Sequence, residues 1–280
     1  MLIILIILTA CTKQQFKAPI VPEVSPKTTE PLIDPAGSEV ITRFLPPVGY
    51  HRKSVPADSF AHYLRHLPLK TAGTTVKYFN GAEKTKDVYE AVIDMAISDK
   101  DLQQCADAII RLRAEYFYSI RAYDRISFKL TNGFTMDYTD WAEGRRVVVN
   151  GNKTFWQQTA QPSDSYQNFR EYLEFVFMYA GTLSLAQTLK PQRIEDLGIG
   201  DVFIVGGSPG HAVIVVDLAE NEKGDKAFLL AQSYMPAQET QILKNKNDLA
   251  LSPWYLTSEI HTELKTPEWK FEREELMTWH

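Results

Sequence analysis

One cysteine and one histidine have the residue types and local sequence that nucleophilic catalysis requires. A capping pattern at 101–104, with Asp first and Gln fourth, predicts a helix that begins just before Cys105 and extends to about Ala122. The free N–H groups and the dipole at a helix start lower the pKa of a nearby thiol, which favours a thiolate nucleophile. His211 begins a predicted strand directly after the glycine-rich turn 206–210, where a substrate backbone has room to approach. A thiol on a helix and an imidazole on an adjacent strand form the pair that thiol catalysis needs.

A general base also needs a third group that holds its ring in one tautomer. Asp217 lies six residues beyond His211 on the same predicted strand, which is about 20 Å away at about 3.3 Å per residue. The neighbouring predicted strand ends at Gln232, and if Val213 pairs opposite Gln232, its amide lies on the same sheet face and within reach of the ring. A register shifted by one residue would present Ser233 instead. We therefore predict a catalytic triad of the cysteine, His211 and Gln232.

Both candidate catalytic residues also have a purely structural interpretation. Cys105 shares a helical face with Ile109, Leu112 and Tyr116, which directs it toward the core, where free cysteines are common. The chain has two cysteines, and if the first carries lipid, Cys105 has no partner within the chain. His211 could equally be a turn histidine. The reactive-thiol and the buried-thiol interpretations both stay open.

Three other groups of residues could bind a ligand, and each has a simpler explanation. Helix charges could hold a carboxylate, but a charge run on a helix is usually a solvated face. Histidines without an acidic or cysteine ligand nearby do not complete a metal site, so no metal is expected. Tryptophans could stack on sugar rings, although core packing is their usual role. The helix charges are Arg111, Arg113 and Glu115, the histidines are His51, His62 and His66, and the tryptophans are Trp141, Trp156 and Trp254.

Hydrophobic periodicity and turn signals predict a single α+β domain over residues 46–280, in which 46–97 is a candidate N-terminal subdomain. The dipeptide Asn150-Gly151 between two β-rich segments is a strong hairpin signal. The order of elements puts the cysteine on a helix and the histidine in an antiparallel meander. We expect helices at 60–67, 101–122 and 165–189, and strands at 76–79, 88–97, 147–156 (a hairpin), 200–205, 211–217 and 227–232.

The first eleven residues have the layout of a lipoprotein signal peptide. An apolar run, 2–8, leads into Leu-Thr-Ala-Cys11, and polar residues follow at once. The run is far shorter than the about 20 apolar residues that a membrane-spanning helix needs. The tetrad resembles the lipobox of bacterial lipoproteins, which implies acylation of Cys11 and attachment to membrane lipid in the cell envelope. Residues 12–45, rich in Pro, Thr, Ser and acidic residues, are expected to form a flexible stalk.

Composition narrows the classes of partner. Hydrophobic residues make up 44% of the chain, which is ample for a packed core. The net charge is −5, and a chain without a basic excess does not follow a phosphate backbone, so nucleic acid is not an expected partner. The sequence has no phosphate-binding loop, dinucleotide fingerprint or zinc-ligand spacing, and no cofactor is expected.

The meander resembles a known peptidase core. The segments Gly200-Asp201-Val202-Phe203-Ile204 and Gly210-His211-Ala212-Val213-Ile214-Val215 are similar to the core of the NlpC/P60 and CHAP branches of papain-like cysteine peptidases. The resemblance implies a papain-like fold in which Cys105 attacks an amide bond and His211 shuttles the proton. Given the expected envelope location, peptidoglycan stem peptides are the implied substrate. The sequence departs from these families in having Gln104-Cys105-Ala106-Asp107 instead of the usual Asp-Cys-Ser-Gly, and in a long insertion between Cys and His.

Over nearly its full length the chain also resembles an uncharacterised lipoprotein family, domain of unknown function 4846. The matching segments are the lipobox, 101–107, 111–116, 207–212 and 231–236. That resemblance supports an envelope location and supplies no activity. Two alternatives to the hydrolase therefore stay open: a non-catalytic lipoprotein that binds a peptide or glycan in the same cleft, and an acyl transferase on the same thiol.

Overall fold

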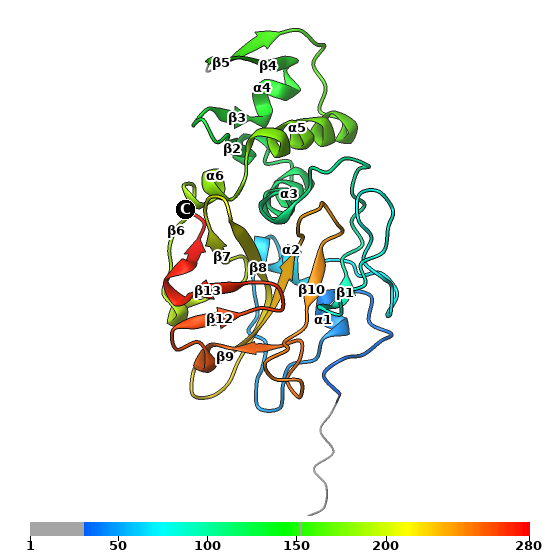
Figure 1. Cartoon of the computed structure of the whole chain (residues 1–280), viewed down its shortest axis with the longest axis vertical. Helices are drawn as coiled ribbons and strands as arrows, with labels where there is room; N and C mark the ends of the chain where they lie inside the picture. Colours follow the sequence, from blue (N-terminus) through cyan, green and yellow to red (C-terminus); the bar gives the residue numbers. More distant parts are fainter. Residues whose placement is uncertain (1–30, 152) are drawn as a thin grey trace, which may run out of the picture. The chain divides into compact units, whose positions relative to one another are not determined.

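The segment that begins with His211 is a strand of a central antiparallel sheet, which has eight strands. Figure 1 labels this strand β8. The computed structural model describes residues 31–151 and 153–280. The strands lie in the order β1-β10-β9-β8-β7-β14-β6, and β11 also pairs with β9. Their bounds are β1 Tyr89–Val92, β6 Lys190–Pro191, β7 Val202–Val205, β8 His211–Glu220, β9 Lys226–Gln232, β10 Gln241–Leu243, β11 Tyr255–Leu256 and β14 Leu276–Thr278. Three hairpins complete the strands: β2 Ser127–Lys129 with β3 Thr135–Asp137, β4 Arg145–Asn150 with β5 Lys153–Gln158, and β12 Glu263–Lys265 with β13 Lys270–Glu272.

Both faces of the central sheet are buried. Ala212, Ile214 and Val216 of β8 belong to a larger core, whereas Val213 and Val215 belong to a smaller core on the opposite face. The smaller core is closed by the hairpin of β12 and β13. A strand that is covered on both faces reads as an almost unbroken apolar run, which is the pattern of β8.

The helices are α1 Val40–Arg43, α2 Phe60–Arg65, α3 Cys105–Ser119, α4 Tyr138–Ala142, α5 Tyr166–Tyr179 and α6 Thr182–Ala186. Helices α1, α2 and α3 pack against β8 and α6 packs against β7, whereas α4 and α5 pack on each other beside the β2–β3 and β4–β5 hairpins (Figure 1). Short 3-10 turns are η1 Tyr123–Arg125, η2 Ile194–Asp196, η3 Thr257–Glu259 and η4 Arg273–Glu275. The predicted α+β class is confirmed.

Several predicted boundaries need correction. The expected helix 165–189 is two helices, α5 and α6, because the chain is extended at Ala180 and Gly181. The expected strand 76–79 is absent from the described part of the chain, where this segment makes only single bridges, and strand 88–97 shortens to β1. The hairpin at Asn150-Gly151 is confirmed, with Asn150 opposite Lys153.

Residues Pro31–His280 form one unit, and this unit begins before residue 46. Val40 and Phe44 are fully buried in the larger core, because helix α1 turns both side chains inward. The segment 31–45 is therefore part of the folded unit and not of a stalk. Cys11 and the rest of the predicted signal peptide lie outside the described residues. Within those residues, we find no helix with the length and apolar character needed to cross a membrane.

Candidate active site

Cys105 is the first residue of helix α3. A capping box fixes this start: the backbone N–H of Gln104 donates to a carboxylate oxygen of Asp107 at 3.0 Å, while the Gln104 side chain donates to Asp101 at 3.1 Å. The predicted cap at Asp101 was thus wrong by three residues, because the reciprocal partner of the box is Asp107. The correction moves the thiol into the first turn, where the N–H groups are free.

The Cys105 thiol is buried, with 7% of the residue exposed. Burial, helped by the nearby Asp107 carboxylate, raises the pKa of the thiol to about 11. The backbone N–H groups of Ala106, Ala212 and Cys105 itself point at the sulfur and oppose this shift in part. The expectation of a resting thiolate is therefore wrong, because desolvation outweighs the helix start. The Ala212 contact puts the sulfur next to the backbone that carries His211. Within residues 31–151 and 153–280, the structure shows no hydrogen bond between the thiol and the His211 ring, which bonds to Gln232.

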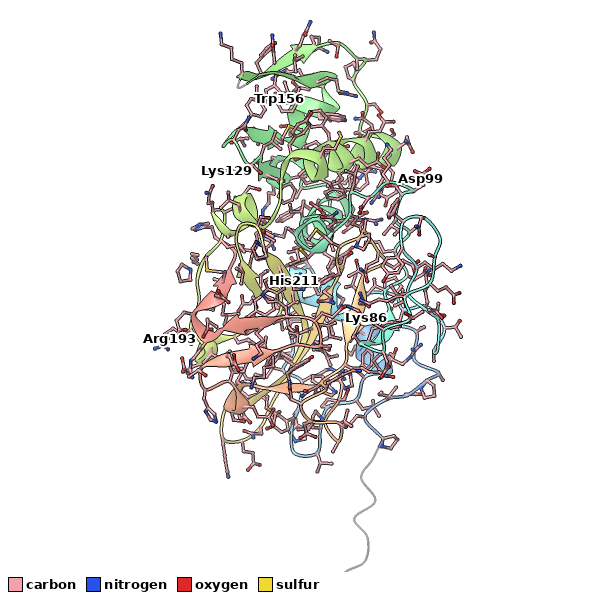
Figure 2. All side chains as sticks on the ribbon, in the orientation of Figure 1. Lys86, Asp99, Lys129, Trp156, Arg193 and His211 are labelled. Carbon is pink, nitrogen blue, oxygen red and sulfur yellow. The ribbon has the colours of Figure 1, made fainter. Side chains whose placement is uncertain are left out.

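His211, labelled in Figure 2, is the first residue of β8 and lies opposite Val205 of β7. Only 2% of it is exposed. Its ring lies among three aromatic rings, with centroid distances of 4.7 Å to Tyr234, 5.4 Å to Trp269 and 5.9 Å to Phe271. Burial in this apolar surrounding lowers the pKa of His211 to about 4. The imidazole is thus neutral at neutral pH and can accept a proton.

The turn before His211 needs a glycine at its last position. A Cβ on Gly210 would lie 2.4 Å from the hydroxyl of Thr182 and 2.4 Å from the carbonyl of Gly207. These contacts are too close for any side chain, and one of them is to backbone that cannot move aside. Gly210 therefore allows α6 to pack tightly against the approach to His211.

Gln232 contacts the ring directly, as predicted for the third member of the triad. Its Oε1 lies 2.8 Å from His211 Nε2. Ile214 pairs with Ala231, which is the register that brings Val213 opposite Gln232, so the predicted register is confirmed. Ser233, the alternative in a shifted register, instead has its hydroxyl 2.7 Å from the carbonyl of Gln238 and 3.0 Å from that of Gln103, and can donate to either.

A buried carboxylate behind Gln232 fixes which way the amide points. The amide Nε2 of Gln232 donates to Glu268 at 2.8 Å. Because an ionised carboxylate only accepts hydrogen bonds, the amide nitrogen must face Glu268 and the amide oxygen must face His211. His211 then donates from Nε2, which leaves Nδ1 unprotonated and able to accept a proton.

Glu268 is held by Lys84, whose ammonium lies 2.7 Å away and also donates to Gln238 at 2.9 Å. The side chains are 1% exposed for Lys84 and 5% for Glu268, and burial lowers the pKa of the lysine. Neither residue was predicted from the sequence. Glu268 lies in the turn between β12 and β13 and Lys84 in an irregular segment, so no local pattern signals that they meet.

A cavity of about 430 Å³ opens beside the helix start. Cys105 and Asp107 line it from α3, Gly210 from the turn before His211, and Thr182 from α6. Burial raises the pKa of Asp107 to about 8, and its Oδ1 has no hydrogen-bond partner in the described part of the chain. The thiol thus faces a space that a small polar ligand can enter, with a neutral carboxylic acid on its wall.

The remaining sequence candidates lie elsewhere. Asp217 is fully buried between Arg52 and Arg65, at 2.7 Å from each. Its carboxylate is therefore engaged by arginines and does not orient His211. Within 31–151 and 153–280, no group of three His, Cys, Asp or Glu residues could hold a metal ion. His62 and His66 stack on each other, with centroids 4.0 Å apart.

The charged residues of α3 that could together bind a carboxylate lie on two different sides of the helix. Arg111 is buried and donates to the Ala96 carbonyl, to Gln103 and to Glu115, so it is fully engaged. Arg113 lies on a different side, against aromatic rings. Two of the tryptophans, Trp141 and Trp254, are buried, as core packing predicts.

Comparison with known proteins gives a family but no relative of known activity. No curated protein and no solved structure is similar enough to the chain to be a match. Residues 40–278 match the family model described as a domain of unknown function (4846), a match that spans all of the candidate site. The chain therefore belongs to the family called domain of unknown function 4846.

Proposed function

We propose that the protein is a membrane-tethered thiol hydrolase of the cell envelope that cleaves an amide bond in peptidoglycan stem peptides. The observation that carries this proposal is the chain of contacts from Glu268 through Gln232 to His211 Nε2. In the proposed mechanism the remaining nitrogen, Nδ1, is the base for the thiol of Cys105; the two side chains must come together at the start of β8, where the sulfur contacts the backbone N–H of Ala212. A core of the papain-like kind, with the nucleophile on a helix and the base on the adjacent strand, fits the same arrangement.

The reaction would begin from a neutral pair, because the thiol has a raised pKa and the imidazole a lowered one. The Cys105 sulfur attacks the carbonyl carbon as its proton passes to Nδ1 of His211. The N–H groups at the start of α3 are suited to stabilise the oxyanion that forms. His211 then gives the proton to the departing amine, which leaves a thioester. Water, deprotonated by the same histidine, hydrolyses the thioester and restores the thiol.

The substrate class follows from the cavity and the proposed location. A volume of about 430 Å³ accommodates a short peptide segment and not a folded protein. Acylation of Cys11 would hold the site at a membrane surface beside the cell wall. A Cys11→Ser variant should lose both metabolic labelling with palmitate and membrane association. An unchanged membrane fraction would contradict the tether and leave the hydrolase proposal intact.

A non-catalytic binding protein is the second candidate, and the burial of the pair favours it. Cys105 and His211 are both almost inaccessible and both neutral. Such a protein would hold a peptide or glycan in the same cavity without turnover. An acyl transferase on the same thiol would use the same first step with an amine in place of water.

Digestion of purified peptidoglycan distinguishes these candidates. The protein should release fragments with new amino groups, and both Cys105→Ala and His211→Ala should abolish the release. His261→Ala is the matched control, because His261 is exposed and lies away from the cavity. Fragment binding without any release by the unmodified protein would support the binding protein. Equal release by Cys105→Ala would exclude the thiol mechanism.

A further inference from the structure

Arg113 and Arg125 are two guanidinium groups without a carboxylate partner in the described part of the chain. Their central guanidinium carbons lie 4.5 and 4.4 Å from the ring centre of Phe117. The two carbons therefore cannot be further apart than the sum of these two distances. Burial and repulsion from Arg125 together lower the pKa of Arg113 to about 10. Two cations held this close need a counter-charge.

Aromatic rings keep Arg113 in place. Its guanidinium also lies 4.7 Å from the ring centre of Phe60 and 4.9 Å from that of Trp279. Stacking on aromatic faces restricts the side chain while its N–H groups stay free to donate at the ring edges. The positive charge is thus pre-organised before any ligand binds.

The two arginines line a cavity of about 290 Å³ between α3, η1, β2 and the segment after β14. Ser127 and Thr188 add hydroxyl groups to its wall and His280 also lines it, while its described lining contains no aspartate or glutamate side chain and neither arginine forms an ion pair in the described residues. The cleft around Arg111 differs in this respect, because Glu115 and other acids neutralise it. We call the cavity beside Arg113 and Arg125 the arginine pocket.

We propose that the arginine pocket binds a ligand through a phosphoryl group. Two bidentate guanidinium forks that approach one carboxylate must share the same two oxygens, whereas a phosphoryl group spreads its acceptor sites over three terminal oxygens. A phosphate monoester also carries nearly two negative charges at neutral pH, which matches the two cations. A soluble phosphate ester and a lipid headgroup share this chemistry.

The pocket is separate from the candidate active site. Arg113 lies eight residues after Cys105 on α3, which is about 12 Å further along the axis at about 1.5 Å per residue. The proposal therefore stands whether or not the thiol is catalytic.

Calorimetric titration with inorganic phosphate tests the pocket, using the full chain with Cys11→Ser so that it is not acylated. Arg113→Lys and Arg125→Ala should each weaken binding by at least about tenfold, since each removes charge-assisted hydrogen bonds. Arg125 is exposed, so its replacement should leave the fold unchanged, which circular dichroism can verify. Arg193→Ala is the matched control, because it removes one positive charge from a distant exposed ion pair.

Vesicles containing phosphatidic acid, compared with phosphatidylcholine vesicles, give the second arm. Vesicle binding that depends on Arg113 and Arg125 would identify a lipid headgroup, and binding of phosphate alone would identify a soluble phosphate ester. The proposal is overturned if neither probe binds. It is also overturned if chloride at equal ionic strength competes fully, or if the Arg125→Ala variant binds as the unmodified protein does.

Discussion

Replacing Glu268 by glutamine tests the buried relay behind His211 most sharply, because the shape is kept and only the charge is lost. Glu268 accepts from Lys84 at 2.7 Å and from Gln232 at 2.8 Å, and both charged side chains are almost fully buried. In Glu268→Gln, the Lys84 ammonium is left buried without a counter-ion. The amide at 268 can also donate, so Gln232 is no longer forced to turn its oxygen toward His211.

Breaking a buried ion pair by removing one partner costs roughly 3–5 kcal/mol of stability. The cost should depend on pH through Lys84. The pKa of Lys84 in the folded protein is already below 10.5, and the loss of Glu268 lowers it further. The unfolded chain then binds more protons below that pH, so the stability of the variant rises as the pH rises toward 10.5. The loss of stability of Glu268→Gln relative to the unmodified protein should therefore be largest near neutral pH.

Urea unfolding at neutral and at alkaline pH measures both effects. Glu220→Gln is the matched control, because it removes one carboxylate from a pair with the exposed Lys53. Its loss of unfolding free energy should be only a small fraction of that of Glu268→Gln. The double variant Lys84→Met with Glu268→Leu should recover most of the stability, since no buried charge remains. A Glu268→Gln variant as stable as the control would refute a desolvated pair.

Further predictions concern the triad itself. Gln232→Ala should lower turnover by much less than Cys105→Ala, because the base loses its orientation but not its proton chemistry; an unchanged rate would remove Gln232 from the triad and leave the dyad. Iodoacetamide should label native Cys105 more slowly than a free model thiol at neutral pH, because the thiol is buried and its pKa is about 11; labelling faster than the model thiol would contradict this. Stability should fall by up to roughly 3 kcal/mol as the pH falls from 6.5 to about 4, because the folded state keeps His211 neutral there while the unfolded chain binds a proton. The decrease should be smaller in His211→Gln, and equal pH profiles for the two proteins would rule out His211 as its cause.

The contact between His211 and Gln232 could be predicted because it depends on one short connection. β8 and β9 are joined by a polar turn, and the alternation of side chains along each strand leaves few registers that keep both faces apolar. Asp217 was correctly excluded by its distance, because six residues along one strand span about 20 Å. The position of the cysteine at a helix start was also predictable, although its exact place in the first turn depended on which acidic residue completed the capping box.

The rest of the site could not be read from local pattern. Glu268 reaches Gln232 from a different hairpin, and Lys84 comes from a segment without regular structure. The protonation state of Cys105 was mispredicted because the helix start is visible in the sequence, whereas the depth of burial depends on packing by distant elements. The break between α5 and α6 was missed because the apolar period continues past Gly181.

The most direct test of the central claim is to trap the acyl group on the thiol. A peptidoglycan stem peptide prepared as an activated ester is incubated with the protein, and the reaction is stopped with acid. Mass spectrometry of the digested protein should find the acyl group on Cys105, with far less in His211→Ala and an unchanged amount in His261→Ala. Acyl groups on other residues alone, or equal amounts on Cys105 with and without His211, would contradict the mechanism.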